Sequence, residues 1–408
     1  MLGGSGHAFV VAILLTSVIK SALEAVIKET TKPLKNPVIL IPGDGGNRIY
    51  ARLRESPANQ SSELIWLNLK DFIDTDTITR VLSLHYDDQF RSHDAKEYEI
   101  TFPGWGDTET VSTLDSHQKI FGRYFDGIID DLKLDPYFVS NRSIRGAPYD
   151  FRRAPNENGQ FFQRLKALIE ETYSINNNQR VVLVGHSMGC LMSMLFMEKQ
   201  SLEWKKQYVK SFVSLAGPYG GAAKVLRVVA SGENFHVFFR SPLVFRDLQR
   251  TFASFYFMVP DPRLWSANEI LVETPKRNYT SRDYKQFFED IGFPIGQNLM
   301  EKSVKGVDFF NGPTGVDEVY CLYGTSLPTD HKMVYSPPSI LRRPFPNQVP
   351  TVMYGNGDGT VNIRSLEVCK MWSNVTVIPL PLARHLEIMR DARVLKLMRK
   401  LTGFEEVH

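Results

Sequence analysis

The chain has 408 residues, of which 43% are hydrophobic and 12% aromatic, enough for a large core in one or two domains. Basic residues exceed acidic ones by only three charges, and the two signs are interspersed along the chain. No basic block marks a nucleic-acid binder, so the composition favours a globular protein that does not bind nucleic acid.

An apolar run of twelve residues occupies positions 8–19. Because a membrane-spanning helix needs about 20 residues, the run is typical of a secretory signal. The usual basic residues before such a signal are missing, and an uncleaved anchor is the alternative. We expect a signal peptide and linker over residues 1–30 and the folded domain over residues 31–408.

A buried strand is predicted over residues 37–41, and the Gly-rich segment Pro-Gly-Asp-Gly-Gly-Asn follows it at 42–47. This segment lacks the ending of a Walker loop, and Arg48 stands where a dinucleotide-binding loop needs its third glycine, which argues against nucleotide binding. The turn instead suits a backbone N–H, that of Asp44, facing a developing oxyanion. A plain strand-to-loop turn is the alternative.

Residues 50–100 are polar and irregular apart from the apolar hexamer Leu-Ile-Trp-Leu-Asn-Leu at 64–69. Trp66 and Leu67 in such an insertion predict a loop that enters lipid, since indole rings favour the membrane interface. A small satellite core is an equal alternative.

The segment Val-Val-Leu-Val-Gly-His-Ser-Met-Gly at 181–189 predicts a strand buried on both faces, a sharp turn and a helix. In that setting Gly-x-Ser-x-Gly is the nucleophile elbow of α/β-hydrolases, whose glycines let the backbone pass close to a strained serine. Ser187 is therefore the predicted nucleophile, with an ordinary Gly-containing turn as the alternative. Apolar residues at helical spacing predict helices over 117–135 and 160–174.

A further strand is predicted over residues 209–216, and the next one only at 318–323. The intervening segment, residues 222–317, is too long for a loop and is rich in aromatic residues. We expect a cap or lid over the site, whose aromatic side chains line an acyl pocket or form the cap's own core.

Two last strands, predicted over 350–354 and 375–380, lead toward Asp358 and His385. We expect both strands in a parallel sheet, with the acid and the imidazole at its carboxyl edge. In the α/β-hydrolase order of nucleophile, acid and histidine, Asp358 is the predicted acid and Asp330 the weaker alternative. A calcium-binding turn is disfavoured because too few carboxylates cluster there.

These residues predict acyl transfer through a covalent intermediate. His385 removes the proton of Ser187, Asp358 orients the imidazole, and the N–H groups of Met188 and Asp44 hold the oxyanion. Neither Cys-x-x-Cys nor His-Glu-x-x-His occurs in the chain, and no metal or cofactor is expected.

Three cysteines in a secreted chain predict one bridge and one free thiol. Cys321 in a strand and Cys369 in a helix are the expected pair, and Cys190 is expected to be a small buried side chain. Four glycosylation sequons agree with passage through the secretory pathway. They begin at Asn59, Asn141, Asn278 and Asn374.

Several longer motifs follow one another in a fixed order. They are Val-Ile-Leu-Ile-Pro-Gly-Asp at 38–44, Ile-Trp-Leu-Asn-Leu at 65–69, Arg-Gly-Ala-Pro-Tyr-Asp-Phe-Arg-Arg-Ala-Pro at 145–155, Gly-His-Ser-Met-Gly at 185–189, Cys-Leu-Tyr-Gly-Thr at 321–325 and Gly-Asp-Gly-Thr-Val-Asn at 357–362. With them the chain resembles the lecithin:cholesterol acyltransferase family from about residue 37 to the C-terminus.

The residues predict an α/β-hydrolase fold with a mostly parallel sheet and a large cap over 222–317, and the resemblance implies a membrane-binding insertion over 50–100. It also implies the Ser187–His385–Asp358 triad, the oxyanion donors given above and the disulfide. One departure concerns the insertion: relatives carry a second disulfide there, whereas this chain has no cysteine between positions 1 and 189.

The resemblance implies a calcium-independent phospholipase A of the lysosome lumen that works at a phospholipid membrane and also transfers acyl groups to alcohols such as ceramide, and this is the leading hypothesis. An extracellular phospholipid–sterol acyltransferase is the runner-up within the same family. A lipid-binding module with an inactive hydrolase fold is the alternative from another class.

Overall fold

The computed structural model describes residues 34–57, 60–68, 74–116, 122–234, 240–303 and 308–404. The chain divides into two units, Met1–Lys35 and Asn36–His408. Nearly all described residues belong to the second unit, whose architecture follows. The predicted signal at 1–30 lies outside the described residues.

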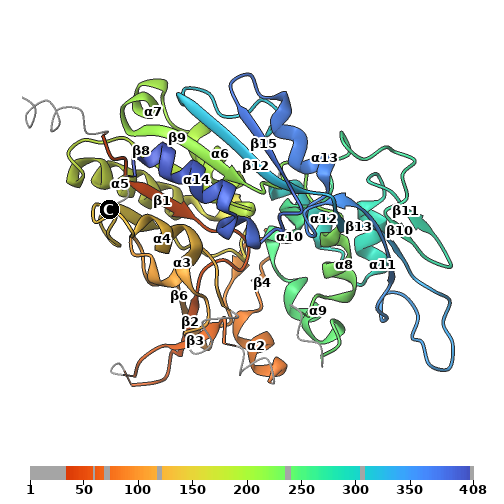
Figure 1. Ribbon diagram of the computed structural model, residues 1–408. Coiled ribbons are helices and arrows are strands. Elements are labelled where there is room, and N and C mark those ends of the chain that lie inside the picture. Colours follow the sequence, from red (N-terminus) through yellow and green to blue (C-terminus); the bar gives the residue numbers. More distant parts are fainter. Residues whose placement is uncertain are drawn as a thin grey trace, which may run out of the picture. The chain divides into compact units, whose positions relative to one another are not determined.

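A parallel sheet of six strands in the order β15-β12-β9-β8-β1-β7 forms the centre of this unit (Figure 1). Every residue of β1 and β8 is buried, as expected of continuous apolar strands covered on both faces. The strands predicted near residues 37, 181, 209, 318 and 375 are all confirmed in this sheet. Their bounds are β1 Val38–Ile41, β7 Ile144–Gly146, β8 Val181–His186, β9 Val209–Leu215, β12 Glu318–Thr325 and β15 Thr376–Pro381.

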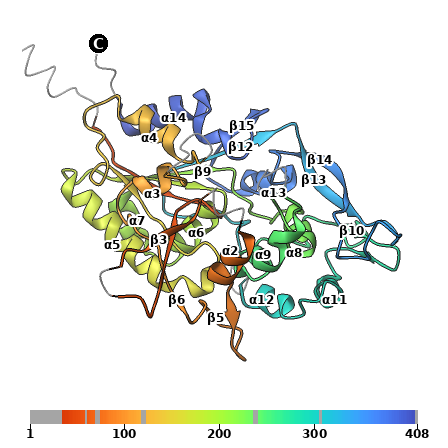
Figure 2. The same ribbon diagram turned by 90° about the horizontal axis from the view of Figure 1, so that it is seen from below.

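Helices cover both faces of the central sheet. Figures 1 and 2 both place α4 (Asp126–Leu132) and α14 (Ala392–Thr402) on one face, and α5 (Gly159–Ile175) and α6 (Met188–Glu198) on the other. The helix predicted over 160–174 is confirmed as α5. Of the helix predicted over 117–135, only α4 is helical among the described residues, so the helix is shorter than predicted. Residues 117–121 lie outside the described residues. Shorter helices are α3 Glu109–Ser112, α7 Leu202–Tyr208 and α13 Ile363–Leu366.

A second sheet has the order β11-β10-β13-β14. Here β13 (Leu327–Val334) and β14 (Thr351–Gly357) form an antiparallel hairpin. The prediction that the strand at 350–354 lies in the parallel sheet is therefore wrong. The reason is visible in its burial: only Gly357 of β14 is buried, so the short run Val-Met-Tyr does not form a strand covered on both faces.

The segment 50–100 is more regular than predicted. Three strands form a small antiparallel sheet in the order β3-β2-β6, in which Ala51 lies opposite both Glu63 and Ile100. The elements of this segment are β2 Ile49–Leu53, β3 Glu63–Trp66, α2 Thr75–Leu82, β4 His85–Tyr86, β5 Ser92–His93 and β6 Tyr98–Thr101.

Residues 222–317 fold into helices and two very short strands. These are α8 Lys224–Ser231, α9 Leu243–Gln249, α10 Ala253–Phe257, β10 Val272–Glu273, β11 Asn278–Tyr279, α11 Tyr284–Asp290 and α12 Gly296–Ser303. Trp265 and Tyr256 are fully buried, so several aromatic side chains form a core of this segment. Because β10 pairs with β13, the segment shares a sheet with residues that follow it in the chain. No helix among the described residues has the length and apolar character needed to cross a membrane.

Candidate active site

Ser187 stands at the sharp turn between β8 and α6. Its φ of 53° is in the left-handed region that side chains other than glycine rarely adopt. The flanking glycines permit this turn, because a Cβ on Gly189 would lie 2.2 Å from the carbonyl oxygen of Ile41, and a Cβ on Gly185 would lie 2.9 Å from Cys190 Cα. The local sequence thus holds a partly buried hydroxyl at the end of a central strand.

His385 links the serine to a buried carboxylate. Its Nε2 lies 3.0 Å from Ser187 Oγ, and its Nδ1 lies 2.7 Å from Asp358 Oδ2. Because an ionised carboxylate only accepts hydrogen bonds, the imidazole proton lies on Nδ1. Nε2 is then free to accept the serine proton. The structure therefore brings together the three side chains that were predicted to form the triad, although they span nearly two hundred positions of sequence.

Asp358 is held from several sides. Its Oδ1 accepts hydrogen bonds from the N–H groups of Thr360 (2.9 Å) and Val361 (2.8 Å), and its carbonyl oxygen accepts from the N–H of His385 (3.0 Å). The tight turn after β14 thus aims the carboxylate at the imidazole. Asp330, the alternative acid, is instead paired with Arg227 at 2.6 Å.

A hydrogen-bonded chain behind the triad involves two residues that the sequence analysis missed. The N–H of Gly43 donates to Tyr124 Oη (2.9 Å), the Tyr124 hydroxyl donates to His186 Nδ1 (2.5 Å), and His186 Nε2–H donates to the carbonyl oxygen of His385 (2.9 Å). Burial lowers the pKa of His186 well below its ordinary value, and the neighbouring His385 adds to this effect. His186 therefore stays neutral and, through Tyr124, ties the loop after β1 to the backbone carbonyl of His385.

The loop after β1 lies directly against Ser187. A Cβ on Gly43 would be 2.7 Å from Ser187 Cβ, which places the Asp44 peptide next to the serine. Met188 is the first residue of α6, so its N–H has no acceptor within the helix. Both predicted oxyanion donors thus lie beside Ser187, and their role remains a prediction.

A cavity of about 190 Å³ opens above Ser187 and His385. Its walls are partly apolar and partly charged; they include Asp44, Lys224, Val225, Val228, Glu233, Phe255, Met258 and Leu386. Burial raises the pKa of Asp44 to about 7, an effect that Lys224 partly offsets. Burial also favours neutral Glu233, but the ion pairs with Lys224 and Arg227 hold its pKa at about 2. The cavity therefore combines an apolar wall with a charged end.

Trp66 does not reach outward from the insertion. Its side chain is 8% exposed, its indole N–H donates to the carbonyl oxygen of Gly45 (2.8 Å), and its ring packs against Phe151 with centroids 5.8 Å apart. Leu67 is half-buried against the same core. Both residues pack as the satellite-core alternative expects, and their entry into lipid stays a prediction.

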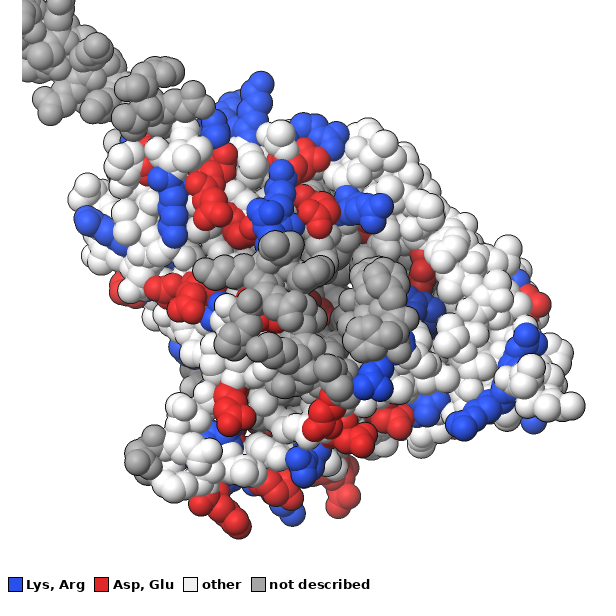
Figure 3. All heavy atoms as spheres, turned by 60° about the horizontal axis from the view of Figure 1, so that its bottom comes forward, with Lys and Arg blue, Asp and Glu red and all other residues white. Residues whose placement is uncertain are grey.

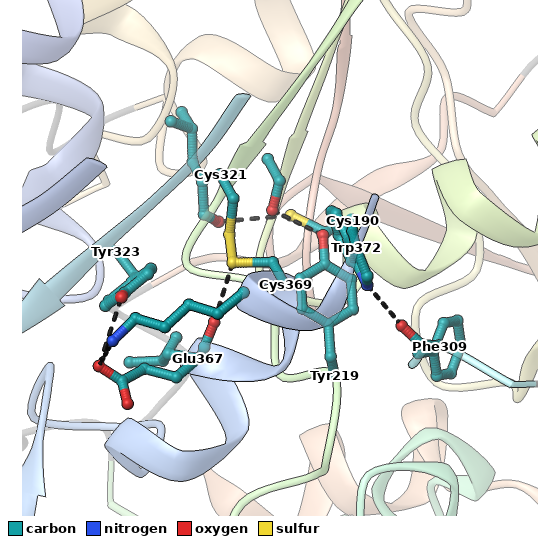
Figure 4. Close-up of a disulfide and its surroundings, with 12 residues drawn as sticks. Cys190, Tyr219, Phe309, Cys321, Tyr323, Glu367, Cys369 and Trp372 are labelled. Carbon is teal, nitrogen blue, oxygen red and sulfur yellow. Dashed lines mark hydrogen bonds and ion pairs between the residues drawn. A yellow bond between two sulfur atoms is a disulfide. The ribbon is translucent and has the colours of Figure 1, made fainter. Parts of the chain in front are cut away.

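The predicted cysteine pair is bridged: Cys321 in β12 and Cys369 in the 3-10 helix Glu367–Met371 form a disulfide (Figure 4). Cys190 is a buried free thiol nearby. Burial raises the pKa of this thiol to about 12, which keeps it protonated at neutral pH. The disulfide thus links the middle of a central strand to the segment after the Asp358 turn.

Three of the predicted glycosylation sites, Asn141, Asn278 and Asn374, are exposed, whereas Asn59 lies outside the described residues. Their modification remains a prediction. Within the described part of the chain, no group of three or more His, Cys, Asp or Glu side chains converges as a metal site would require.

A parallel sheet covered by helices on both faces, with a serine, histidine and aspartate linked at its carboxyl edge, defines an α/β-hydrolase. The family model of lecithin:cholesterol acyltransferase matches residues 62–311 and 309–392. The chain belongs to this family of enzymes.

Two relatives and one solved structure illustrate the similarity. Lysosomal phospholipase A and acyltransferase of Homo sapiens is 37% identical over 381 residues, which cover 90% of each chain. Phosphatidylcholine-sterol acyltransferase of Gallus gallus is 37% identical over 353 residues, covering 83% of this chain and 82% of that protein. The crystal structure of the Tle4-Tli4 complex shares the fold at a TM-score of 0.52 and 14% identity, covering 90% of this chain and 97% of that one.

Proposed function

We propose that this protein is a phospholipase A that hydrolyses the acyl esters of glycerophospholipids without calcium and also passes the acyl group to lipophilic alcohols such as ceramide. The observation that carries the proposal is the continuous hydrogen-bonded chain from Ser187 through His385 to Asp358, which opens into a partly apolar cavity. A lipid-binding module would not need these linked hydrogen bonds.

The reaction follows from the geometry in two halves. His385 Nε2 takes the proton of Ser187 Oγ, which attacks the ester carbonyl, and the N–H groups of Asp44 and Met188 stabilise the oxyanion. His385 then returns the proton to the leaving glycerol oxygen, releasing a lysophospholipid and leaving an acyl-enzyme. In the second half His385 removes a proton from water or from an alcohol, whose oxygen attacks the acyl carbonyl; the bond from the acyl group to Ser187 Oγ then breaks, and His385 returns the proton to Oγ.

Acyl transfer to an alcohol rather than to water depends on which nucleophile reaches the acyl-enzyme. The cavity wall near Ser187 includes Val225, Val228, Phe255 and Met258, and apolar side chains favour a lipid alcohol over bulk water. Relatives named phospholipase and acyltransferase support both outcomes.

We place the protein in the lysosome lumen. Relatives named lysosomal cover 90% of the chain, and three exposed sequons fit a luminal protein. In an acidic compartment Asp44, with its pKa of about 7, carries its proton, so the cavity loses one negative charge beside the nucleophile.

A second candidate is an extracellular phospholipid–sterol acyltransferase. The specific observation in its favour is the relative of that name from Gallus gallus, which is as similar in identity as the lysosomal one. The two candidates differ in acceptor alcohol and in working pH.

The deciding experiment measures the products of a labelled phospholipid from pH 4 to pH 8, with no acceptor, with ceramide or with cholesterol. We expect fatty acid and acylceramide to dominate at acidic pH. Cholesteryl ester as the main product at neutral pH would favour the second candidate instead.

Ser187→Ala tests the mechanism itself, with Ser174→Ala as a matched control, because Ser174 is an exposed hydroxyl at the end of α5. We expect Ser187→Ala to abolish both turnover and labelling by a fluorophosphonate, and the control to keep both. Turnover that survives Ser187→Ala would remove the acyl-enzyme mechanism.

A further inference from the structure

The loop between β13 and β14, residues 335–350, carries the most exposed apolar side chains in the described part of the chain. Ile340 and Leu341 are 103% and 98% exposed, respectively. A single exposed aliphatic side chain is ordinary on a protein surface. Two adjacent ones, both almost fully exposed, leave apolar surface in water whose burial would be favourable. In Figure 1 the loop is the blue chain that projects beyond β13 at the lower right.

The base of this loop is fixed to the rest of the molecule. The rings of Tyr335 and Phe345 meet edge to face with centroids 4.7 Å apart, which closes the neck. The Gln348 amide donates to the carbonyl oxygens of Ser336 and Arg343, at 2.9 Å each. A loop with such a neck presents its tip in one place.

The tip itself is a closed turn. The N–H of Ser339 donates to the carbonyl oxygen of Arg342 (3.0 Å), and the N–H of Arg342 donates back to Ser339 (3.1 Å). Ile340 and Leu341 occupy the two positions between them. Because this turn is hydrogen-bonded and prolines lie on both sides of it, the two side chains are held outward and do not fold back onto the sheet.

The surroundings of the tip are basic. Arg342 and Arg343 follow the apolar pair, both are exposed, and neither guanidinium is in an ion pair among the described residues. Positions 331–357 contain no aspartate or glutamate. Figure 3 shows that the right-hand side of this view is mostly uncharged, with scattered lysine, arginine and acidic side chains.

We propose that the 335–350 loop is a membrane-contact element, in which Ile340 and Leu341 enter the acyl boundary of an anionic phospholipid surface while Arg342 and Arg343 pair with its phosphates. The aliphatic side chains lie at the apex of the loop and the cations lie just behind them. This order matches a membrane surface, in which the phosphates lie outside the acyl chains. The proposal rests on the proposed function insofar as a phospholipase must reach a bilayer. It supplies a contact that the buried Trp66 does not.

Vesicle binding tests the element without any turnover. Full-length Ser187→Ala protein is sedimented with vesicles of phosphatidylcholine, alone or mixed with phosphatidylserine. Adding Ile340→Ser with Leu341→Ser is expected to lower the partition coefficient at least about tenfold on both. Adding Arg342→Gln with Arg343→Gln is expected to lower it about 30-fold on the anionic vesicles and little on the neutral ones.

Two controls match these changes elsewhere on the surface. Leu134→Ser removes an apolar side chain that is 62% exposed after α4, and Lys396→Gln with Lys400→Gln removes two charges from α14. Both controls should bind vesicles as the parent does. Equal binding by the loop variants and the parent overturns the proposal, whether or not the enzyme hydrolyses phospholipid.

Leu341→Cys reports on the position of the tip directly. The chain's own cysteines are a disulfide and a buried thiol, so a fluorophore that is sensitive to polarity would label the new thiol alone. We expect a blue shift on adding anionic vesicles and none for the same label at Leu134→Cys. A shift that grows with protein concentration in the absence of vesicles would instead reveal contact between protein copies and refute the lipid assignment.

Discussion

The carboxyl of Asp44 makes a prediction about stability that can be worked through in detail. Burial raises its pKa from 3.8 to about 7 in the folded protein, with Lys224 opposing part of the effect, and Oδ1 has no hydrogen-bond partner among the described residues. In the unfolded chain the same carboxyl has an ordinary pKa near 3.9. The change to test is Asp44→Asn, which keeps the shape and removes the titration.

The sign follows from which state binds the proton. Between about pH 4 and pH 7 the folded protein keeps the proton on Asp44 while the unfolded chain has released it, so this group makes the folded state less stable as pH rises. A difference of about three pKa units corresponds to about 4 kcal/mol. Wild type should lose that amount across this window, relative to Asp44→Asn, and the loss should level off above pH 8.

The assay is urea unfolding of both proteins at pH steps from 4 to 8, followed by tryptophan fluorescence and circular dichroism. Asp88→Asn is the matched control, because Asp88 is exposed and should leave the pH profile of wild type unchanged. We expect Asp44→Asn to gain stability over wild type as pH rises from 4 to 8. Parallel profiles for wild type and Asp44→Asn would show that the carboxyl is solvated, and the reasoning from burial would be refuted.

Three other predictions concern stability. Cys321→Ala with Cys369→Ala opens a loop of 48 residues and should lower the free energy of unfolding by about 4 kcal/mol, measured by urea unfolding against the oxidised parent. Gly189→Ala should prevent folding of the elbow and leave no soluble enzyme, whereas Gly159→Ala, with open space at its Cβ, should express normally. Trp66→Ala should lower the free energy of unfolding by about 3 to 5 kcal/mol, and an unchanged midpoint would contradict its core position.

The central sheet was predictable because its strands are continuous runs of apolar residues. Residues 38–41 and 181–184 are buried without exception, and a short run of that kind has few other places in a fold. The elbow was predictable for a related reason: only glycine at positions 185 and 189 permits the close approach of backbone that the turn requires. Both signals are local in the sequence.

What could not be predicted depends on partners far away in the chain. The run at 64–69 looks like a membrane loop because nothing near it shows that Trp66 reaches Gly45 and Phe151. The Tyr124–His186 hydrogen bond joins residues 62 positions apart. His186 was visible as the residue before the nucleophile, but its partner was not.

The assignment of β14 to the wrong sheet has a similar cause. Its apolar residues suggested a central strand, yet its neighbour in space is β13, half of whose residues are polar. Strand pairing is set by both partners, and one strand alone does not reveal the other. The position of Asp358 after a strand was correct even so.

The β13–β14 hairpin has a practical consequence for protein engineering. The Asp358 turn lies at one end of the hairpin and residues 339–342 lie at the other. Between them β13 and β14 pair from Leu327–Gly357 to Val334–Thr351. Peptide tags, targeting sequences or loops from relatives could be grafted at the far end without displacing the acid at the near end. The chain therefore offers a site where attachment to different surfaces can be rewritten independently of chemistry.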